Sequence, residues 1–390
     1  MHILIIPSWY KTPRSPVKGT FFEEQARMFQ KKGHQVGILV PQHNLQFQGN
    51  TRFKLETKIN NFNDEGISTF YSHTQSFVPK IAVPTKIDIL QTSLAAYKKY
   101  KEYKRENGQP DIIHAHSVIW GGVVASYISR REQIPYFLTK HFTGWIFQSK
   151  RSSSKSYRKL LSKIIVNSEK TFVVSSYYKD ELLKKYQLKK NKLEVVPNVV
   201  NPIFYENRCE IKIGSPVRLI VIAYLVERKN HITLFQAVKL LKGRGLKIEL
   251  KVVGNGSYEK DLQSFVIDND LENEVQLIGL LDRSEVVEVI NESHIVVSAS
   301  TFETFGVNII EGLAVGRPCV VLDSGGPRDI MRKKDGILFS ENSPEAFANG
   351  IQEVIENYKM YDQNEIAESC VKRFGENTIY EKICSEYSII

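Results

Sequence analysis

The sequence predicts an α/β fold made of two Rossmann-like domains, each with a doubly wound parallel sheet. Short runs rich in Ile, Val and Leu alternate with stretches of helical spacing along the 390 residues. These runs are almost continuously apolar, which is typical of parallel strands covered on both faces. Because a chain of this length exceeds what one hydrophobic core usually supports, we expect two domains.

The apolar runs give the expected strands in order. They lie at 2–7, 35–40, 111–116, 136–141, 171–176, 193–198, 217–225, 248–254, 275–281, 294–300, 318–323 and 336–339. Helical spacing between them is clearest at 20–33 and 230–245. Prolines in a polar interval separate two strand–helix series, so we place a linker at 200–214. The expected domains are therefore 1–203 and 204–370.

Charge differs sharply between the two halves of the chain. Residues 1–205 hold 32 Lys and Arg against 14 Asp and Glu, a net charge of +18. Residues 206–390 hold 21 against 29, a net charge of −8. A basic half in a soluble chain usually indicates an anionic partner: nucleic acid, an anionic membrane surface or phosphorylated substrates.

Bulk features exclude several classes of protein. The longest apolar runs, such as 219–226, fall short of the roughly 20 residues that span a bilayer. The chain enters a strand-like run directly after Met1, without a charged and apolar leader, so we expect a cytoplasmic protein. Four cysteines without a C-x-x-C spacing argue against a disulfide framework or a zinc site.

Two carboxylates, Glu303 and Glu311, follow the expected strand at 294–300. In open parallel sheets, ligands bind beyond the carboxyl ends of the strands, so a cleft between the two domains is the default site. Gly306 precedes an expected helix whose N-terminal N–H groups suit a phosphate. Carboxylates beside a phosphate site favour a ligand that also carries hydroxyls, such as a nucleotide sugar. The alternative is a pair of solvated acids on a surface helix.

The stretch 298–330, "SASTFETFGVNIIEGLAVGRPCVVLDSGGPRDI", contains E-x7-E and resembles the signature of family 4 retaining glycosyltransferases of the GT-B fold. Other stretches fall in that family's order, from "GTFFEEQARMFQKKGHQV" and "DIIHAHSVIWGG" to "LVERKNHITLFQAV" and "VVGNG". The similarity covers nearly the whole chain. It implies a C-terminal nucleotide-sugar domain, an N-terminal acceptor domain, and a last helix at 371–390 that returns to the N-terminal domain.

The resemblance implies donor contacts in the C-terminal half. Glu303 would bind hydroxyls of the donor sugar, and Glu311 would accept from the ribose. The backbone N–H groups of four consecutive residues would hold the sugar or diphosphate: Phe305, Gly306, Val307 and Asn308. Gly254, in "VVGNG", would line the nucleotide pocket or simply turn the chain.

Lys229 would meet the diphosphate leaving group, where a cation makes its departure easier. The family usually has an Arg five or six positions earlier, whereas this chain has Ala223 and Tyr224 there. Arg228 is the candidate that would compensate for this missing cation. A solvated Lys or Arg at a helix start is the alternative for both.

In the N-terminal half, the family places a His like His141 beside the reacting carbon of the donor sugar. His116 is a candidate on the acceptor side, and packing is an equally open interpretation for it. Gly19 would permit close phosphate approach in the N-terminal loop, where Lys18 replaces a second glycine that the family usually has.

Two basic segments, 98–105 and 150–165, interleave positive charge with apolar and aromatic residues. The second is predicted to be amphipathic, of the kind that lies on anionic lipid headgroups. We therefore expect peripheral attachment to the inner face of the plasma membrane; the alternative is that this segment is only a solvated basic face. No recognised nucleic-acid module appears, so we expect no nucleic-acid partner.

The resemblance, taken with these features, implies a retaining hexosyltransferase that uses a UDP- or GDP-sugar and a hydroxyl acceptor. The acceptor would be a lipid-linked glycan in capsule, exopolysaccharide or lipopolysaccharide synthesis. Family analogy implies no cofactor and no metal. Two alternatives remain: a nucleotide-sugar 2-epimerase, and a non-catalytic GT-B partner subunit.

Overall fold

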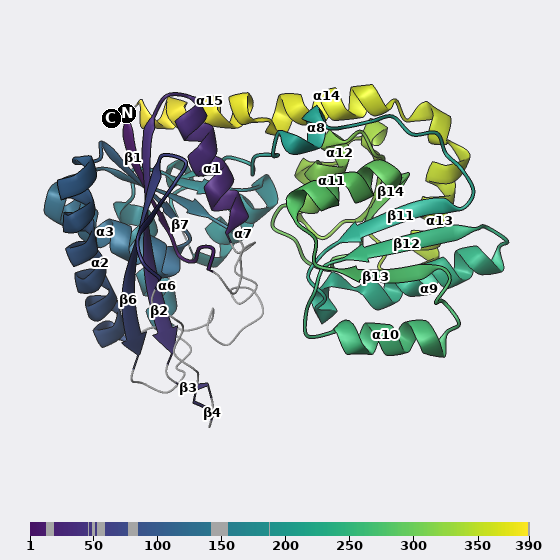
Figure 1. Ribbon diagram of the computed structural model, residues 1–390, viewed down its shortest axis with the longest axis horizontal. Coiled ribbons are helices and arrows are strands. Elements are labelled where there is room, and N and C mark those ends of the chain that lie inside the picture. Colours follow the sequence, from purple (N-terminus) through teal and green to yellow (C-terminus); the bar gives the residue numbers. More distant parts are fainter. Residues whose placement is uncertain are drawn as a thin grey trace. The chain divides into compact units, whose positions relative to one another are not determined.

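The protein is described by a computed structural model that covers residues 1–12, 19–45, 47–48, 51–52, 59–76, 85–141, 155–186 and 188–388. The chain divides into two compact units (Figure 1). Unit 1 comprises Met1–Val174, Lys179–Val196 and Lys382–Ile390. Unit 2 comprises Ser175–Tyr178 and Pro197–Glu381, so the segment 200–214 groups with unit 2.

Unit 1 is built around a sheet in which eight of the described strands pair in the order β10-β9-β8-β7-β1-β2-β6-β5. Its strands are β1 (His2–Pro7), β2 (Gln35–Leu45), β5 (Phe62–Asp64), β6 (Ile67–Ser76), β7 (Ile112–His116), β8 (Tyr136–Lys140), β9 (Thr171–Val173) and β10 (Leu193–Val195). Every pair is parallel except β5 with β6. A short antiparallel pair, β3 (Phe47–Gln48) with β4 (Thr51–Arg52), lies outside this sheet.

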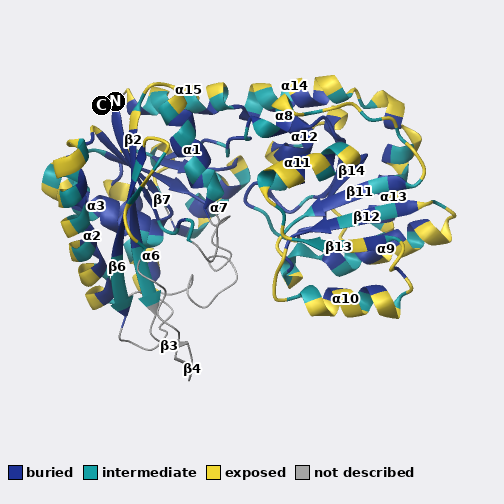
Figure 2. Ribbon diagram, in the orientation of Figure 1, coloured by how far each residue is buried: buried dark blue, intermediate teal, exposed yellow. Residues whose placement is uncertain are grey.

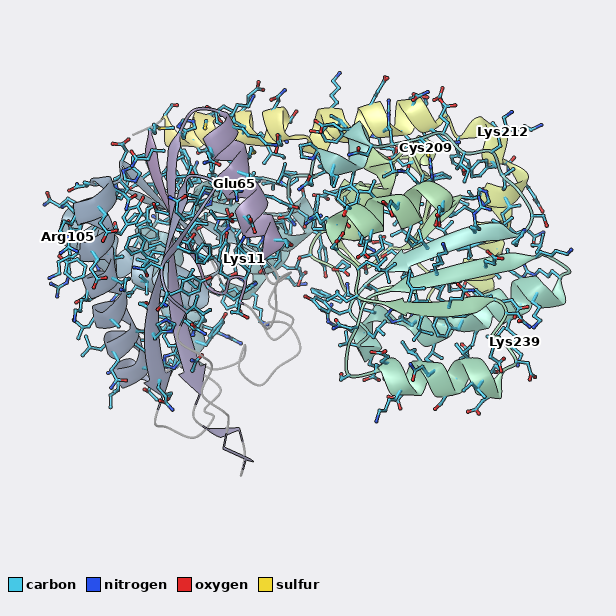
Figure 3. The ribbon with its side chains drawn as sticks, viewed as in Figure 1. Lys11, Glu65, Arg105, Cys209, Lys212 and Lys239 are labelled. Carbon is cyan, nitrogen blue, oxygen red and sulfur yellow. The ribbon has the colours of Figure 1, made fainter. Side chains whose placement is uncertain are left out.

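Helices connect and cover these strands. They are α1 (Thr20–Lys31), α2 (Lys86–Asn107), α3 (Val123–Glu132), α6 (Lys155–Asn167) and α7 (Ser176–Tyr186), together with the end of α15 (Glu376–Tyr387). Lys11 and Arg27 bind Asp64 at 2.8 and 2.9 Å, and Arg27 also binds Glu65 at 3.2 Å. These ion pairs fasten α1 and the loop after β1 to the β5–β6 hairpin (Lys11 and Glu65 in Figure 3).

Unit 2 contains a fully parallel sheet of described strands in the order β13-β12-β11-β14-β15-β16. These strands are β11 (Val217–Ile222), β12 (Ile248–Val253), β13 (Val275–Gly279), β14 (Ile295–Ser298), β15 (Cys319–Leu322) and β16 (Gly336–Phe339). Its helices are α8 (Ile203–Glu206), α9 (His231–Gly243), α10 (Glu259–Asp268), α11 (Arg283–Glu292), α12 (Val307–Ala314), α13 (Pro344–Glu356) and α14 (Gln363–Phe374). Among the described helices, none is long and apolar enough to cross a membrane.

The predicted fold class is confirmed, and each of the expected strands is present. The central strands are buried, the edge strands β5 and β13 are only partly buried, and the helices expose one side (Figure 2). This is the pattern of parallel sheets that are covered on both faces. The sequence reading missed the β5–β6 hairpin, because the second half of β6, "SHTQS", is polar and gives no apolar run.

The strand order places a topological switch point in each sheet. In unit 1, β1 lies between β2 and β7; in unit 2, β11 lies between β12 and β14. Loops after neighbouring strands diverge at such a point and leave room for a ligand. The loops that follow β1 and β7, and those that follow β11 and β14, are therefore the places to look for a site.

Arg317 is the largest fully buried side chain of the described residues, and it holds several segments of unit 2 together. Its guanidinium donates to the carbonyls of Cys209, Ile290 and Asn291 at 2.7, 3.3 and 3.0 Å. It also donates to Gln363 Oε1 at 2.8 Å. These bonds join the segment after α8 to the end of α11 and the start of α14.

We predict that Arg317→Met lowers the free energy of unfolding of unit 2 by on the order of 3 kcal/mol, because several buried acceptors lose their donor. Urea unfolding followed by circular dichroism measures this change. Arg244→Met is the matched control, since Arg244 is exposed. A loss for Arg317→Met no larger than that of the control would contradict the assignment.

Lys140 gives a pH-dependent prediction for unit 1, where its side chain is buried. Burial, with a smaller effect from the charge of Lys185, lowers the pKa of Lys140 from 10.5 to about 7. Between these values the unfolded state binds more protons than the native state, so stability rises with pH. We predict that urea stability increases from about pH 7 to about pH 9, and that Lys140→Met removes most of the increase.

Tryptophan fluorescence is the appropriate signal for that experiment, because the described tryptophans, Trp9 and Trp120, belong to unit 1. An equal pH slope in Lys140→Met and in the wild type would show that Lys140 is not the titrating group.

Candidate functional site

Three loops meet at the carboxyl edge of the unit 2 sheet, after β11, β14 and β15. The N–H and hydroxyl of Thr301 donate to the carbonyl of Arg228 at 3.0 and 3.1 Å. The N–H of Glu303 donates to the carbonyl of Ser324 at 3.1 Å, and the N–H of Gly326 donates to the carbonyl of Glu303 at 2.9 Å. The loop that carries Glu303 is thus held on both sides by its neighbours.

Lys229 and Glu303 form an ion pair between the loops after β11 and β14. Each side chain is only 12% exposed. Burial alone would raise the pKa of Glu303, but the charge and hydrogen bond of Lys229, a hydrogen bond from Ser300 and the charge of Arg228 together lower it. Glu303 is therefore an ionised carboxylate at the switch point, with two cations close by.

Glu311 has a different partner, which the sequence reading did not single out. Arg283, the first residue of α11, donates from Nη1 to Glu311 Oε1 at 2.8 Å. Burial raises the pKa of Glu311, and the charge and hydrogen bond of Arg283 oppose that effect without cancelling it. Asp282 caps α11 and so fixes where Arg283 starts the helix. The sequence "LLDRSE" carries that capping signal, but it does not indicate a contact with α12.

The N-terminus of α12 lies beside these acids. Gly306 precedes the helix with φ of 124°, and a Cβ there would approach Ile309 Cδ1 to 2.7 Å. The Phe305 ring is buried against Phe374, with ring centroids 5.6 Å apart, so a ligand could meet only its backbone. Val307 begins the helix, and Asn308 donates from Nδ2 to Ser298 Oγ at 3.4 Å. Helix N-termini of this kind attract anions.

Packing explains the glycines after β12. A Cβ on Gly254 would lie 2.0 Å from the carbonyl oxygen of Ala223, and one on Gly256 would lie 2.1 Å from that of Leu225. The N–H of Leu225 also donates to the carbonyl of Asn255 at 2.9 Å. These glycines let the loops after β11 and β12 touch, and a donor contact at Gly254 stays a prediction.

Residues 175–178 belong to unit 2 and support the same loop, which the sequence reading missed. Ser175 Oγ donates to the carbonyl of Thr304 at 2.5 Å. Tyr177 lies against Gly325, where a Cβ would come within 2.2 Å of its ring. This segment therefore fixes the loop from both Thr304 and Gly325.

In unit 1, His116 and His141 lie together at the ends of β7 and β8. His116 Nδ1 lies 3.0 Å from His141 Nε2, and both side chains are buried. Phe22 of α1 contacts both rings, at centroid distances of 4.7 and 5.3 Å. Burial, followed by the charges of His114 and His141, lowers the pKa of His116 well below its usual value, so it is neutral.

His114 serves packing. Its ring contacts Thr139 Oγ1 at 2.6 Å and the Tyr387 hydroxyl at 2.5 Å.

Gly19 has a packing role: it has φ of 82°, and a Cβ there would lie 3.2 Å from the Trp9 carbonyl oxygen. The replacement of a family glycine by Lys18 falls outside the described residues.

The structure describes all of the first basic segment, 98–105, but only part of the second, 150–165. Segment 98–105 lies on α2, where Lys99 and Lys104 pair with Glu102 and Glu132 at 2.6 and 2.8 Å, while Arg105 is exposed (Figure 3). Residues 150–154 fall outside the described residues, and the rest lies on α6. The apolar side of α6 is buried in unit 1, so packing accounts for its amphipathic pattern. The exposed residues of α6 include Lys155, Arg158, Lys159 and Lys163, and a membrane contact through them stays a prediction.

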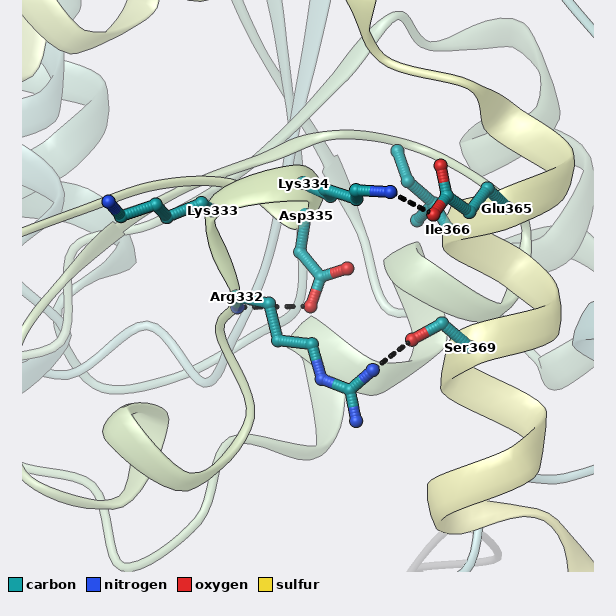
Figure 4. A pocket seen from close by; sticks show the side chains of 7 residues that line it. All are labelled: Arg332, Lys333, Lys334, Asp335, Glu365, Ile366 and Ser369. Atoms are coloured by element: carbon teal, nitrogen blue, oxygen red, sulfur yellow. Dashed lines mark hydrogen bonds and ion pairs between the residues drawn. The ribbon is translucent and has the colours of Figure 1, made fainter.

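A separate pocket of about 300 Å³ opens in unit 2 between residues 332–335 and α14 (Figure 4). Among the side chains that line it, Lys334 contacts Glu365 at 2.5 Å, and Arg332 donates to Ser369 Oγ at 2.8 Å. None of the predicted site residues lines it.

Across the residues with described positions, no group of three or more His, Cys, Asp or Glu could hold a metal ion.

Comparison with known proteins finds a family model for each half of the chain. A family model described as Glycosyltransferase Family 4 matches residues 19–203, and one described as Glycosyl transferases group 1 matches residues 206–368. An uncharacterized glycosyltransferase of Methanocaldococcus jannaschii is 26% identical over 299 residues, 74% of this chain and 80% of the relative.

An Escherichia coli enzyme described as UDP-Gal:alpha-D-GlcNAc-diphosphoundecaprenol alpha-1,3-galactosyltransferase is 25% identical over 331 residues, 80% of this chain and 81% of the relative. Among solved structures, Anabaena HepE in complex with UDP and glucose has a TM-score of 0.74 and 16% identity, with 99% of each chain covered. The two family models together match nearly the whole chain, and the chain belongs to the group 1 glycosyltransferases of the GT-B fold.

Proposed function

We propose that the protein transfers a sugar from a nucleotide-diphosphate donor to a hydroxyl acceptor, with retention at the anomeric carbon. The observation that carries this proposal is the Lys229–Glu303 ion pair, which lies at the switch point of the unit 2 sheet. The N-terminus of α12 follows Glu303 in the same loop. A carboxylate, a cation and a helix N-terminus are the groups that a sugar and its diphosphate require.

The bound donor would interact with both partners of the Lys229–Glu303 ion pair, each through a different group. Hydroxyls of the donor sugar would donate to the ionised carboxylate of Glu303. Lys229 would balance the charge that develops on the diphosphate as the sugar leaves. Arg228 already acts on Glu303 through its charge, so it is near enough to supply the cation missing at Tyr224.

Glu311 would bind the ribose, with Arg283 holding its carboxylate in one orientation. UDP is the first nucleotide to test. In support, HepE is described in complex with UDP and glucose, and the E. coli relative is described as using UDP-Gal.

We propose catalysis without a metal, because Lys229, Arg228 and the α12 N-terminus would supply the positive charge. His141 would contact the donor sugar, oriented by the neutral His116. Family analogy assigns deprotonation of the acceptor to a phosphate oxygen of the donor. A 2-epimerase would instead release its products without an acceptor, and a non-catalytic partner subunit would show no turnover.

For the acceptor, we propose a lipid-linked glycan at the cytoplasmic face of the membrane. The E. coli relative is described as acting on a GlcNAc-diphosphoundecaprenol, and residues 1–205 carry a net charge of +18. We propose that this basic half attaches the protein peripherally to the membrane. There the protein would take part in polysaccharide synthesis.

We predict that Glu303→Gln and Lys229→Met each lower kcat at least about tenfold, since each removes a charge that acts in the transition state. Turnover of UDP- and GDP-sugars with a membrane lipid extract measures this change. The double variant leaves neither member of the Lys229–Glu303 pair without its partner, so it should fold about as well as the wild type and remain inactive. Lys239→Met, at a surface position labelled in Figure 3, is the control. Wild-type rates in both single variants would refute the assignment.

We also predict that one class of nucleotide sugar raises the melting temperature of the protein, because ligands that bind only the folded state stabilise it. A thermal-shift panel of UDP- and GDP-sugars measures this effect, and the UDP series should give the larger shift. No shift with any member at saturating concentration would contradict a donor site in unit 2.

A further inference from the structure

Helix α2 exposes three large apolar side chains in one row. Ile87 is 64% exposed, Leu90 is 53% exposed and Leu94 is 48% exposed. Because they are spaced by three and four residues, they lie along a single face of the helix. One exposed leucine on a surface is ordinary, but neighbouring exposed apolar side chains form a patch, and such patches mark sites of interaction.

The folding of unit 1 does not require this arrangement, because the same turns of α2 bury polar side chains. Asp88, Thr92 and Ser93 are buried. Asp88 forms a capping box with Thr85, and the Thr92 hydroxyl lies 3.0 Å from His43 Nδ1. The first half of α2 therefore turns polar groups toward the protein and apolar groups toward the solvent, the reverse of an ordinary surface helix.

The row continues into the second half of α2 as cations. Lys98, Lys101 and Arg105 follow Leu94 at the same spacing of three and four residues, and all three are exposed (Arg105 in Figure 3). The structure describes every residue of α2, and its one exposed acid is Glu106, which lies 3.7 Å from Arg105. The row is here called the outer face of α2 and consists of Ile87, Leu90, Leu94, Lys98, Lys101 and Arg105.

The apolar half of the outer face lies at the carboxyl edge of the unit 1 sheet. Helix α2 covers the sheet beside β6 (Figure 2). Its first turns contact the carboxyl end of β2, where His43 binds Thr92 and approaches Asp88 at 3.9 Å. His116 and His141, which belong to the proposed sugar site, lie at the ends of their strands on the same edge.

We propose that the outer face of α2 is the surface through which the protein lies on an anionic membrane. Its apolar half would enter the boundary between headgroups and acyl chains, while its three cations would contact anionic headgroups. The inserted half is the one beside the carboxyl edge of the sheet, so the proposed sugar site would lie near lipid-linked glycans. This inference rests on the proposed function, since it names the surface for the proposed membrane attachment.

Other occupants fit the outer face less well. Two copies joined through parallel α2 helices would bring their cations together, and an antiparallel pair would place cations over apolar side chains. Nucleic acid would bind the cations but leave the three apolar side chains in water. The described part of α6 is also basic, but its only exposed large apolar side chain is Val166.

Vesicle flotation of the full chain tests the proposal without a donor or an acceptor. The variant carries Leu90→Gln with Leu94→Gln; the matched control carries Ile267→Gln with Met360→Gln, at exposed apolar positions of unit 2. We expect the wild type and the control to bind phosphatidylcholine vesicles that contain phosphatidylglycerol. The α2 variant should bind at least about tenfold more weakly, because its apolar contacts with the acyl chains are lost.

Three results of this experiment would overturn the proposal. The first is equal vesicle binding by the α2 variant and the control. The second is a melting temperature lowered only in the α2 variant, since another part of the chain would then cover the outer face. The third is a dimer, seen by sedimentation without lipid, that only the α2 variant loses, since a second copy would then occupy the face.

A charge series gives an independent test. One variant carries Lys98→Gln, Lys101→Gln and Arg105→Gln, and its control on α6 carries Lys155→Gln, Arg158→Gln and Lys159→Gln. We expect the α2 series to weaken binding to the anionic vesicles at least about tenfold, and the α6 series to weaken it less. Equal losses would show that the overall charge of the basic half, not the outer face, attaches the protein. Tighter binding to duplex DNA than to the vesicles would assign the face to nucleic acid.

Turnover separates the failure of this inference from the failure of the proposed function. An active transferase whose α2 variant binds vesicles as the wild type does would refute the membrane surface alone. A protein that binds vesicles through the outer face of α2 but turns over no nucleotide sugar would refute sugar transfer alone.

Discussion

The ion pair between Lys229 and Glu303 is the interaction on which the proposed site depends. Both side chains are largely shielded from water, so each charge would be costly without the other. The strand order brings them together, because β11 and β14 are neighbours although Lys229 and Glu303 lie 74 positions apart in the chain. The pair keeps the loops after these strands in register and keeps Glu303 ionised. A donor that carries both hydroxyls and negative charge can replace each partner of the pair.

Much of the fold could be predicted from the sequence, because buried parallel strands leave continuous apolar runs. The β5–β6 hairpin could not, since the outer part of β6 is polar for reasons that only its surroundings explain. Within the site, the spacing of Glu303 and Glu311 indicated a ligand, but their different ion partners depend on tertiary contacts. The sequence around Arg283 predicts only a helix start and not its contact with Glu311. Nothing in the sequence predicts that Arg317 is buried.

Unit 1 shows the same dependence on context. The sequence indicated His116 and His141 as separate candidate residues. Their contact could not be predicted, because it depends on the register of β7 and β8.

We propose that Glu303 and Glu311 bind different parts of one nucleotide sugar. Calorimetric titration is the most direct test of this proposal. UDP and a UDP-sugar would each be titrated into the wild type, Glu303→Gln and Glu311→Gln. We predict that Glu303→Gln weakens binding of the UDP-sugar at least about fivefold and leaves binding of UDP unchanged, whereas Glu311→Gln weakens binding of both ligands alike. Equal affinities for both ligands in all three proteins would contradict it.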